Sequence, residues 1–112
     1  MKEKITVVPT LCASVESAFN LLGRKWVGLV VHVLASGPLH FSELEDAIPG
    51  VSARMLTERI RELEEAGIVT RTVRAGPPVR VVYALSDKGR ALVPVMAGIE
   101  KWARAWDGRS AQ

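Results

Sequence analysis

The chain has 112 residues, 48% of them hydrophobic, and its 15 Lys and Arg against 12 Asp and Glu give a formal net charge of +3. This length fits one domain with a real core, and no apolar run is long enough to span a membrane. A single cysteine excludes an intrachain disulfide, and residues 1–10 lack the long apolar region of a signal peptide, so we expect a cytoplasmic protein.

Two helices are predicted in the first third of the chain. Residues 13–22 form an amphipathic pattern that Gly23 ends. The apolar positions at helical spacing are Val15, Phe19 and Leu22. The next run, KWVGLVVHVLA at residues 25–35, is β-branched but too long for a typical strand, and it stops at SGP. We therefore predict a buried helix there, with Trp26 in the core.

Residues 41–67 have the pattern of a helix-turn-helix. Ser42 and Glu45 have the spacing of a capping box, which predicts a short helix that the following Pro-Gly pair ends. Ser52 is a good N-cap for a second helix over residues 52–66. The narrow apolar stripe of that helix consists of Leu56, Ile60 and Leu63. A short helix, a tight turn and a capped second helix together make a helix-turn-helix.

Residues 69–85 are predicted to form a β-hairpin. Two strand-like runs, IVTRTVR and VRVVYALS, flank the turn sequence AGPP. The hairpin carries Arg71, Arg74 and Arg80 and no acidic side chain. A hairpin directly after a helix-turn-helix predicts the wing of a winged helix-turn-helix. The expected fold class is therefore mostly α with a small β-hairpin (α+β).

A last helix is predicted over residues 87–106, capped by Ser86 and bent at Pro94. A domain this small cannot easily bury both this apolar face and that of residues 13–22, so we expect the two helices to form a homodimer interface. The interface candidates are Val15, Phe19, Leu22, Met96, Ile99, Trp102 and Trp106. Ordinary core packing of the tryptophans is the alternative.

The helix of residues 52–66 is the predicted DNA-reading element, because a helix fits the major groove and reads base edges with its N-terminal half. Arg54 can pair with guanine or hold a phosphate, and Glu58 can accept from cytosine. Four glutamates make this helix slightly acidic, so the positive field must come mainly from the hairpin and from Arg24 and Lys25. The predicted DNA-binding residues are Ser52, Ala53, Arg54, Thr57, Glu58, Arg61, Lys25, Arg74 and Arg80. Taken one by one, each of these charged residues is also explained as part of an ordinary solvent-exposed surface that binds no DNA.

Metal and enzyme chemistry find little support in the sequence. Two histidines and one thiol, widely spaced, lack the paired spacing of a zinc site, and no nucleophile–base arrangement is evident. We therefore expect no cofactor, no metal and no enzymatic activity. Two classes of function stay open: a regulator that binds double-stranded DNA, and a winged-helix module that binds protein. The basic hairpin favours the first.

The sequence also resembles the HxlR-type bacterial transcriptional regulators, relatives of the MarR superfamily. The matching features are Cys12 at the head of the first helix, GRKW at 23–26, FSEL at 41–44, SARMLTERIRELEEAGIV at 52–69, and YALSDKGRALVPVM at 83–96 with Trp102. The resemblance implies a winged-helix homodimer that binds palindromic operators near its target genes, and we expect a repressor. Ala13 stands where the family usually has a proline after the cysteine. Glu58 stands at a position where the family usually has an uncharged or basic residue.

Cys12 is the candidate sensor. A thiol at a helix N-terminus lies near partial positive charge, which favours the reactive thiolate. The resemblance implies more, since several members of the family sense oxidants, quinones or aldehydes through the matching cysteine. We predict that modification of Cys12, or a disulfide between the two Cys12 of a dimer, shifts the spacing of the recognition helices. The alternatives are a buried structural thiol, and control by a non-covalent small-molecule ligand at the dimer interface.

Overall fold

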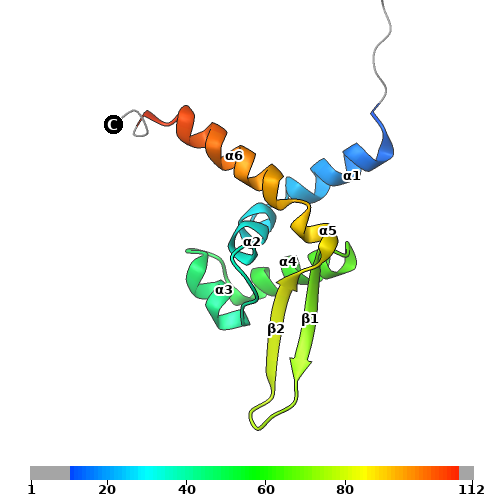
Figure 1. Ribbon diagram of the computed structural model, residues 1–112, viewed down its shortest axis with the longest axis vertical. Coiled ribbons are helices and arrows are strands. Elements are labelled where there is room, and N and C mark those ends of the chain that lie inside the picture. The colour runs from blue at the N-terminus through cyan, green and yellow to red at the C-terminus, as the bar shows by residue number, and fades with distance from the viewer. Residues whose placement is uncertain (1–10, 109–112) are drawn as a thin grey trace, which may run out of the picture.

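A computed structural model describes residues 11–108 as helices around one antiparallel β-hairpin. In chain order the elements are α1 (Ala13–Leu22), α2 (Val27–Leu34), α3 (Phe41–Ala47), α4 (Ala53–Glu65), β1 (Val69–Arg74), β2 (Arg80–Leu85), α5 (Asp87–Arg90) and α6 (Val93–Ala105). Figure 1 shows α2, α3 and α4 as the body of the molecule. The hairpin extends from one end of this body, and α1 and α6 diverge at the other (Figure 1). The predicted fold class, mostly helical with a two-stranded hairpin, is confirmed.

The hydrophobic core lies among α2, α3, α4 and the base of the hairpin. The buried apolar side chains of the three helices are Val27, Val30, Val31 and Leu34 from α2, Leu44 from α3, and Leu56, Ile60 and Leu63 from α4. The apolar stripe predicted for residues 52–66 is therefore buried as a whole. The partly buried Trp26 packs against this core, as expected, with its backbone in the left-handed region at φ 80°.

The start of α3 differs from the prediction. The capping box expected of Ser42 and Glu45 is wrong, because the N-cap is His40 and the carboxylate of Glu43 accepts from the His40 backbone N–H at 2.7 Å. The His40 ring explains the shift, since its Nδ1 lies 3.0 Å from the carbonyl oxygen of Val81 in the hairpin. A contact between distant segments fixes where this helix begins.

The hairpin pairs in register from Val69 opposite Leu85 to Arg74 opposite Arg80. Leu39, in the loop before α3, adds a short bridge to Tyr83 through two backbone hydrogen bonds of 2.9 and 2.8 Å. This bridge and the neighbouring His40 contact attach the hairpin to the helix-turn-helix. The outer half of the hairpin extends beyond these contacts into solvent (Figure 1).

The single helix predicted over residues 87–106 is two helices. α5 ends at Arg90 and α6 begins at Val93, so Pro94 occupies the second position of a new helix. A proline is tolerated there because the first backbone N–H groups of a helix have no intrahelical acceptor. The predicted bend at Pro94 is therefore wrong, and the chain breaks before the proline. Ser86 is confirmed as the N-cap of α5, since its hydroxyl accepts from the Gly89 N–H at 3.0 Å.

The helix α1 has the predicted bounds and ends at Gly23, but it contains no buried residue. Only Leu21 and Leu22, at its C-terminal end, pack partly against the core. The remainder projects away from the body (Figure 1). None of the helices within residues 11–108 is long and apolar enough to cross a membrane.

Candidate nucleic-acid interface

The N-terminus of α4 is built as an exposed, well-capped helix start. The Ser52 hydroxyl accepts from the Met55 backbone N–H at 3.0 Å, which confirms Ser52 as the N-cap. Ala53 is exposed, and the Thr57 hydroxyl donates to the Ala53 carbonyl at 2.8 Å. Both hydroxyls therefore have backbone partners, and the freest group on this turn is the side chain of Arg54, which is 90% exposed.

One turn further along α4, Glu58 limits the charge of the reading face. Its carboxylate lies 3.7 Å from the Arg54 guanidinium, and its side chain is 39% exposed. An ion pair this open to water contributes little to stability. Arg61, on the same side, is exposed.

Arg59 is a functional candidate that the sequence reasoning missed. It is the one charged residue with a buried side chain among residues 11–108, and it is 8% exposed. Its Nε donates to the Lys25 carbonyl at 2.9 Å, and one of its terminal NH2 groups donates to Glu62 at 2.9 Å. The signal was its position, since residue 59 falls on the buried stripe between Leu56 and Ile60. A charge on that face predicts a buried partner.

Arg24 and Lys25 were expected to supply positive field, and the structure separates them. The Arg24 Nε lies 3.0 Å from the Glu62 carboxylate, which also pairs with Arg59, so Arg24 is held in an ion pair within the chain. Lys25 is exposed, and its Nζ lies 4.9 Å from the centroid of the Trp26 ring. The same ring lies against Gly50, in the turn between α3 and α4. Lys25 is therefore an exposed cation beside the helix-turn-helix, with no acidic partner among the residues that the structure describes.

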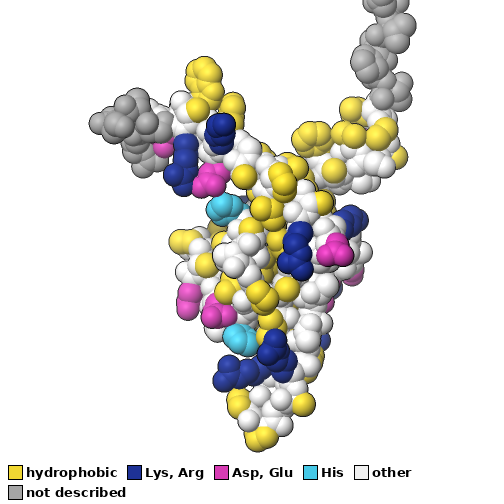
Figure 2. Space-filling view, viewed as in Figure 1, with side chains coloured by type: hydrophobic (Ala, Val, Ile, Leu, Met, Phe, Trp, Pro, Cys, Tyr) yellow, Lys and Arg dark blue, Asp and Glu magenta, His cyan; other side chains and the backbone are white. Residues whose placement is uncertain are grey.

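The hairpin carries its arginines on both faces. Arg74 and Arg80 are directly opposite in the ladder, whereas Arg71, opposite Tyr83, is an odd number of positions from Arg74 along β1 and so points to the other face. All three arginines are exposed. Like charges directly opposite each other disfavour a hairpin unless an anion lies between them. On the face seen in Figure 2, dark-blue basic side chains lie on the hairpin above its apolar tip.

The expected interface residues at the other end of the molecule divide into two sets. Phe19, Ile99, Trp102 and Trp106 are more than half exposed, and Val15 is 42% exposed. Met96 is buried in the core of the chain, which corrects its expected place on the outer face of the last helix. Leu22 is partly buried against the same core. Figure 2 shows the exposed apolar side chains over α1 and the outer end of α6.

Cys12 is exposed and stands at the N-terminus of α1. Its Sγ accepts from the Val15 backbone N–H at 3.4 Å, so the sulfur replaces the hydroxyl or carboxylate that usually caps a helix. In the single chain, the alternative prediction of a buried structural thiol is therefore wrong. Within residues 11–108, no three His, Cys, Asp or Glu side chains cluster as metal ligands.

Comparison with known proteins decides the family. The sequence pattern of the HxlR-like helix-turn-helix family matches residues 21–111. The chain belongs to this family. The match covers α2 to α6, which are the elements that form the helix-turn-helix, the hairpin and the last helix.

Individual relatives and solved structures agree with this family. The HTH-type transcriptional regulator YodB from Bacillus subtilis (strain 168) is 48% identical over 94 residues, which are 84% of this chain and 84% of YodB. The reduced form of YodB superimposes with a TM-score of 0.78 at 44% identity, over 89% of this chain and 98% of that chain. The redox regulator HypR in its reduced form has a TM-score of 0.78 at 34% identity, over 83% and 92% of the two chains. This HxlR-family chain is a transcriptional regulator of the helix-turn-helix type.

Proposed function

We propose that this regulator is a homodimeric repressor that binds a palindromic operator and releases it when Cys12 is oxidised or alkylated. The observation that carries the proposal is the exposed Cys12 sulfur at the start of α1, on the helix that also exposes Phe19. A change at this thiol therefore acts on the helix that we assign to the dimer interface. The distance between two DNA-reading helices depends on that interface.

The arrangement of charge supports operator binding through α4 and the hairpin. Arg54 has a side chain that is 90% exposed at the reading end of α4, and we assign it the contact with a base edge. Arg74 and Arg80 form one cationic pair on the hairpin, suited to a phosphate strand or a narrow minor groove. Lys25, beside the turn of the helix-turn-helix, is assigned to a phosphate. Glu58 then restricts the reading face by repelling phosphates.

The apolar ends of α1 and α6 support a homodimer. Trp102 and Trp106 are 66% and 80% exposed and Phe19 is 73% exposed, although large aromatic side chains are on average mostly buried in folded proteins. The two helices lie on one side of the body, opposite the hairpin (Figure 1). A two-fold axis through this side leaves both copies of α4 and of the hairpin free to bind DNA.

The chemistry at Cys12 is limited by its being the one cysteine in the sequence. With a quinone, the thiolate adds to a ring carbon to form a C–S bond, and the ring takes up the proton to become a hydroquinone thioether. With a diazene oxidant, two thiols lose two electrons and two protons to the oxidant and form a disulfide between two chains. Solved structures of the relative YodB in diamide-treated and quinone-bound forms support both reactions.

Operator binding is tested by titrating the reduced chain into labelled duplex DNA from upstream of its own gene at several salt concentrations. We expect two chains per site and a steep loss of affinity with salt, because phosphate contacts release counterions. A duplex of the same composition in scrambled order is the control. A single chain per site, or equal affinity for the scrambled duplex, would contradict the proposal.

The sensor is tested with the same duplex and the Cys12→Ser chain. Treatment of the natural chain with diamide or benzoquinone should release the operator, and mass spectrometry should show a disulfide-linked pair or one quinone per chain. Cys12→Ser should bind the operator normally and keep it during both treatments. If the serine variant releases the operator as the natural chain does, Cys12 is not the sensor.

A further inference from the structure

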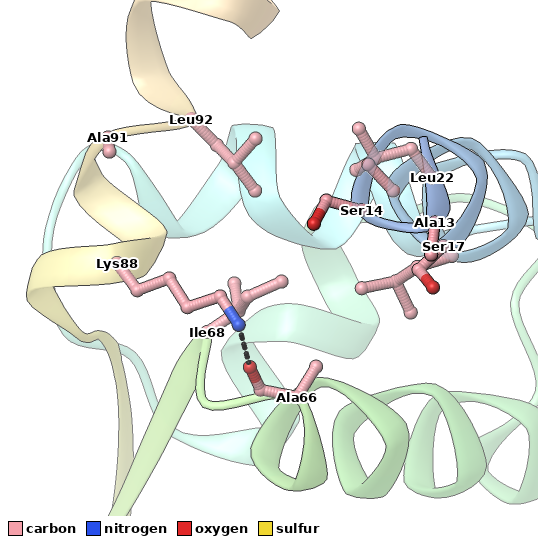
Figure 3. A pocket seen from close by; sticks show the side chains of 11 residues that line it. Ala13, Ser14, Ser17, Leu22, Ala66, Ile68, Lys88, Ala91 and Leu92 are labelled. Carbon is pink, nitrogen blue, oxygen red and sulfur yellow. Dashed lines mark hydrogen bonds between the residues drawn. The ribbon is translucent and has the colours of Figure 1, made fainter. Parts of the chain in front are cut away.

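We infer that the cavity between α1 and the junction of α4, β1 and α5 is a non-covalent binding site for a small amphipathic carboxylate. This cavity measures about 740 Å³, within the range of about 300–1,000 Å³ that is typical of small-molecule sites. Figure 3 shows Ala13, Ser14 and Ser17 of α1 on one side of it, and Lys88, Ala91 and Leu92 across from them. Ala66 and Ile68 line it where α4 passes into β1.

The walls favour an apolar body. Leu21 and Leu22 of α1, Ile68 and Leu92 line the cavity, and the rest of the α1 wall is alanine and serine. These small side chains leave space between the helix and the body where larger ones would fill it. Burial of apolar surface against leucine and isoleucine side chains is favourable at about 25 cal/mol per Å².

The charge at the mouth favours a carboxylate. Lys88 is the one charged side chain among the described lining residues, and none of them is acidic. Its Nζ donates to the Ala66 carbonyl at 2.7 Å, as the dashed line in Figure 3 marks. An ammonium group has three N–H donors, so two are available for an anion. The carbonyl bond holds the cation at the cavity.

Apart from Leu22, which lines it, the cavity is distinct from the face that we assign to the partner chain. Ala13, Ser17 and Leu21 follow one side of α1 at helical spacing and line the cavity, whereas Val15 and Phe19 do not line it. The large exposed apolar side chains of α1 therefore point elsewhere. A second copy that packs on Val15 and Phe19 leaves the small-residue side for a ligand.

A ligand at this site would control the angle of α1. The helix has no buried residue, and it packs against the core only through Leu21 and Leu22, so its first two turns have little to hold them. A bound molecule would contact those turns and the base of the recognition helix together. The effect of a ligand on DNA binding rests on the proposed function, because a change in the angle of α1 would act on DNA through the same helix that carries Cys12.

The test is isothermal titration of 2-naphthoate, with neutral 2-naphthalenemethanol beside it, into the reduced full chain without DNA. We expect 2-naphthoate to bind the natural chain and Cys12→Ser equally, and to bind Lys88→Gln about tenfold more weakly, because a charged hydrogen bond is lost. Ser17→Leu, which fills the cavity, should abolish binding. Lys101→Gln and Ser36→Leu make the same changes outside the cavity and should bind as the natural chain does.

Three results would overturn the inference. The first is no binding of 2-naphthoate to the natural chain, and the second is equal binding to Lys88→Gln and Ser17→Leu. The third is a change of oligomeric state by Ser17→Leu in sedimentation, since this would make a second copy the occupant of the cavity. Circular dichroism of each variant verifies folding, and Lys88→Gln, at an exposed position, keeps the test valid if Ser17→Leu does not fold. No result here depends on operator binding, so failure of the proposed function is measured separately.

Discussion

The Arg59 Nε donates to the carbonyl of Lys25 at 2.9 Å, which joins the recognition helix α4 to the start of α2. The bond holds the peptide just before Trp26, whose φ of 80° is uncommon for a residue other than glycine. Glu62 completes the arrangement by pairing with both Arg59 and Arg24. The position of Lys25 relative to the reading face is therefore set by a buried arginine.

Arg59→Met should lower the free energy of unfolding by about 1–3 kcal/mol, because the Lys25 carbonyl loses its buried donor. It should also weaken operator binding and reduce its salt dependence by about one phosphate contact, because Lys25 is no longer held in place. Urea unfolding and DNA titration at several salt concentrations measure the two effects.

Arg61→Met is the matched control for the stability of Arg59→Met, since Arg61 is exposed on the same helix. Its unfolding free energy should stay within about 0.5 kcal/mol of the natural value. An unchanged salt dependence in Arg59→Met, together with the loss of stability, would reduce Arg59 to a structural role.

Arg54→Ala should weaken binding to the operator by about 1–3 kcal/mol and relax discrimination at one base pair, because a bidentate contact with a base edge is lost. Folding should be unaffected, since this side chain is 90% exposed. Titration with operators substituted at each position identifies the base pair.

Arg104→Ala removes the same charge on α6, away from α4 and the hairpin (Figure 1), and should leave base discrimination unchanged. If Arg54→Ala lowers the affinity for every sequence equally, Arg54 contacts a phosphate rather than a base.

Local patterns in the sequence predicted the parts of the fold that are set by interactions between neighbouring residues. The stripe of Leu56, Ile60 and Leu63 follows the helical period, and Ser52 and Ser86 cap the helices that follow them. The hairpin followed from two β-rich runs around AGPP. These signals depend on neighbours within about one turn, so the sequence alone contains them.

Contacts between distant segments account for what the sequence did not predict. His40 became the cap of α3 because its ring bonds to Val81, forty-one residues away. The break between α5 and α6 did have a local signal in Pro94, whose missing N–H favours the first turn of a helix, but it was interpreted as a bend inside one helix. Val95 and Met96 are adjacent apolar residues, and only packing decides that Met96 is the buried one. Arg59 was overlooked because arginine is rarely buried.

Arg74→Gln and Arg80→Gln should each reduce the salt dependence of DNA binding by about one phosphate contact. Without DNA, either change should stabilise the hairpin by a few tenths of a kcal/mol, because it removes one of two like charges that are directly opposite. Salt-dependent titration and urea unfolding measure the two effects in the same protein.

Lys101→Gln is the control for general loss of charge, since it lies on α6 and should leave the salt dependence unchanged. If both hairpin variants bind DNA with the natural salt dependence, the wing does not contact phosphates, and the paired arginines have another role.

Trp102→Ser should convert the regulator into a folded monomer with much weaker operator binding. This side chain is 66% exposed, so its loss removes apolar surface from the proposed interface while the core of the chain is intact. Leu56→Ala, at a fully buried position, is the contrasting change and should lower the free energy of unfolding by about 2–5 kcal/mol. Analytical ultracentrifugation and thermal unfolding distinguish the two outcomes. A dimer of Trp102→Ser with natural operator affinity would show that α6 does not hold the two chains together.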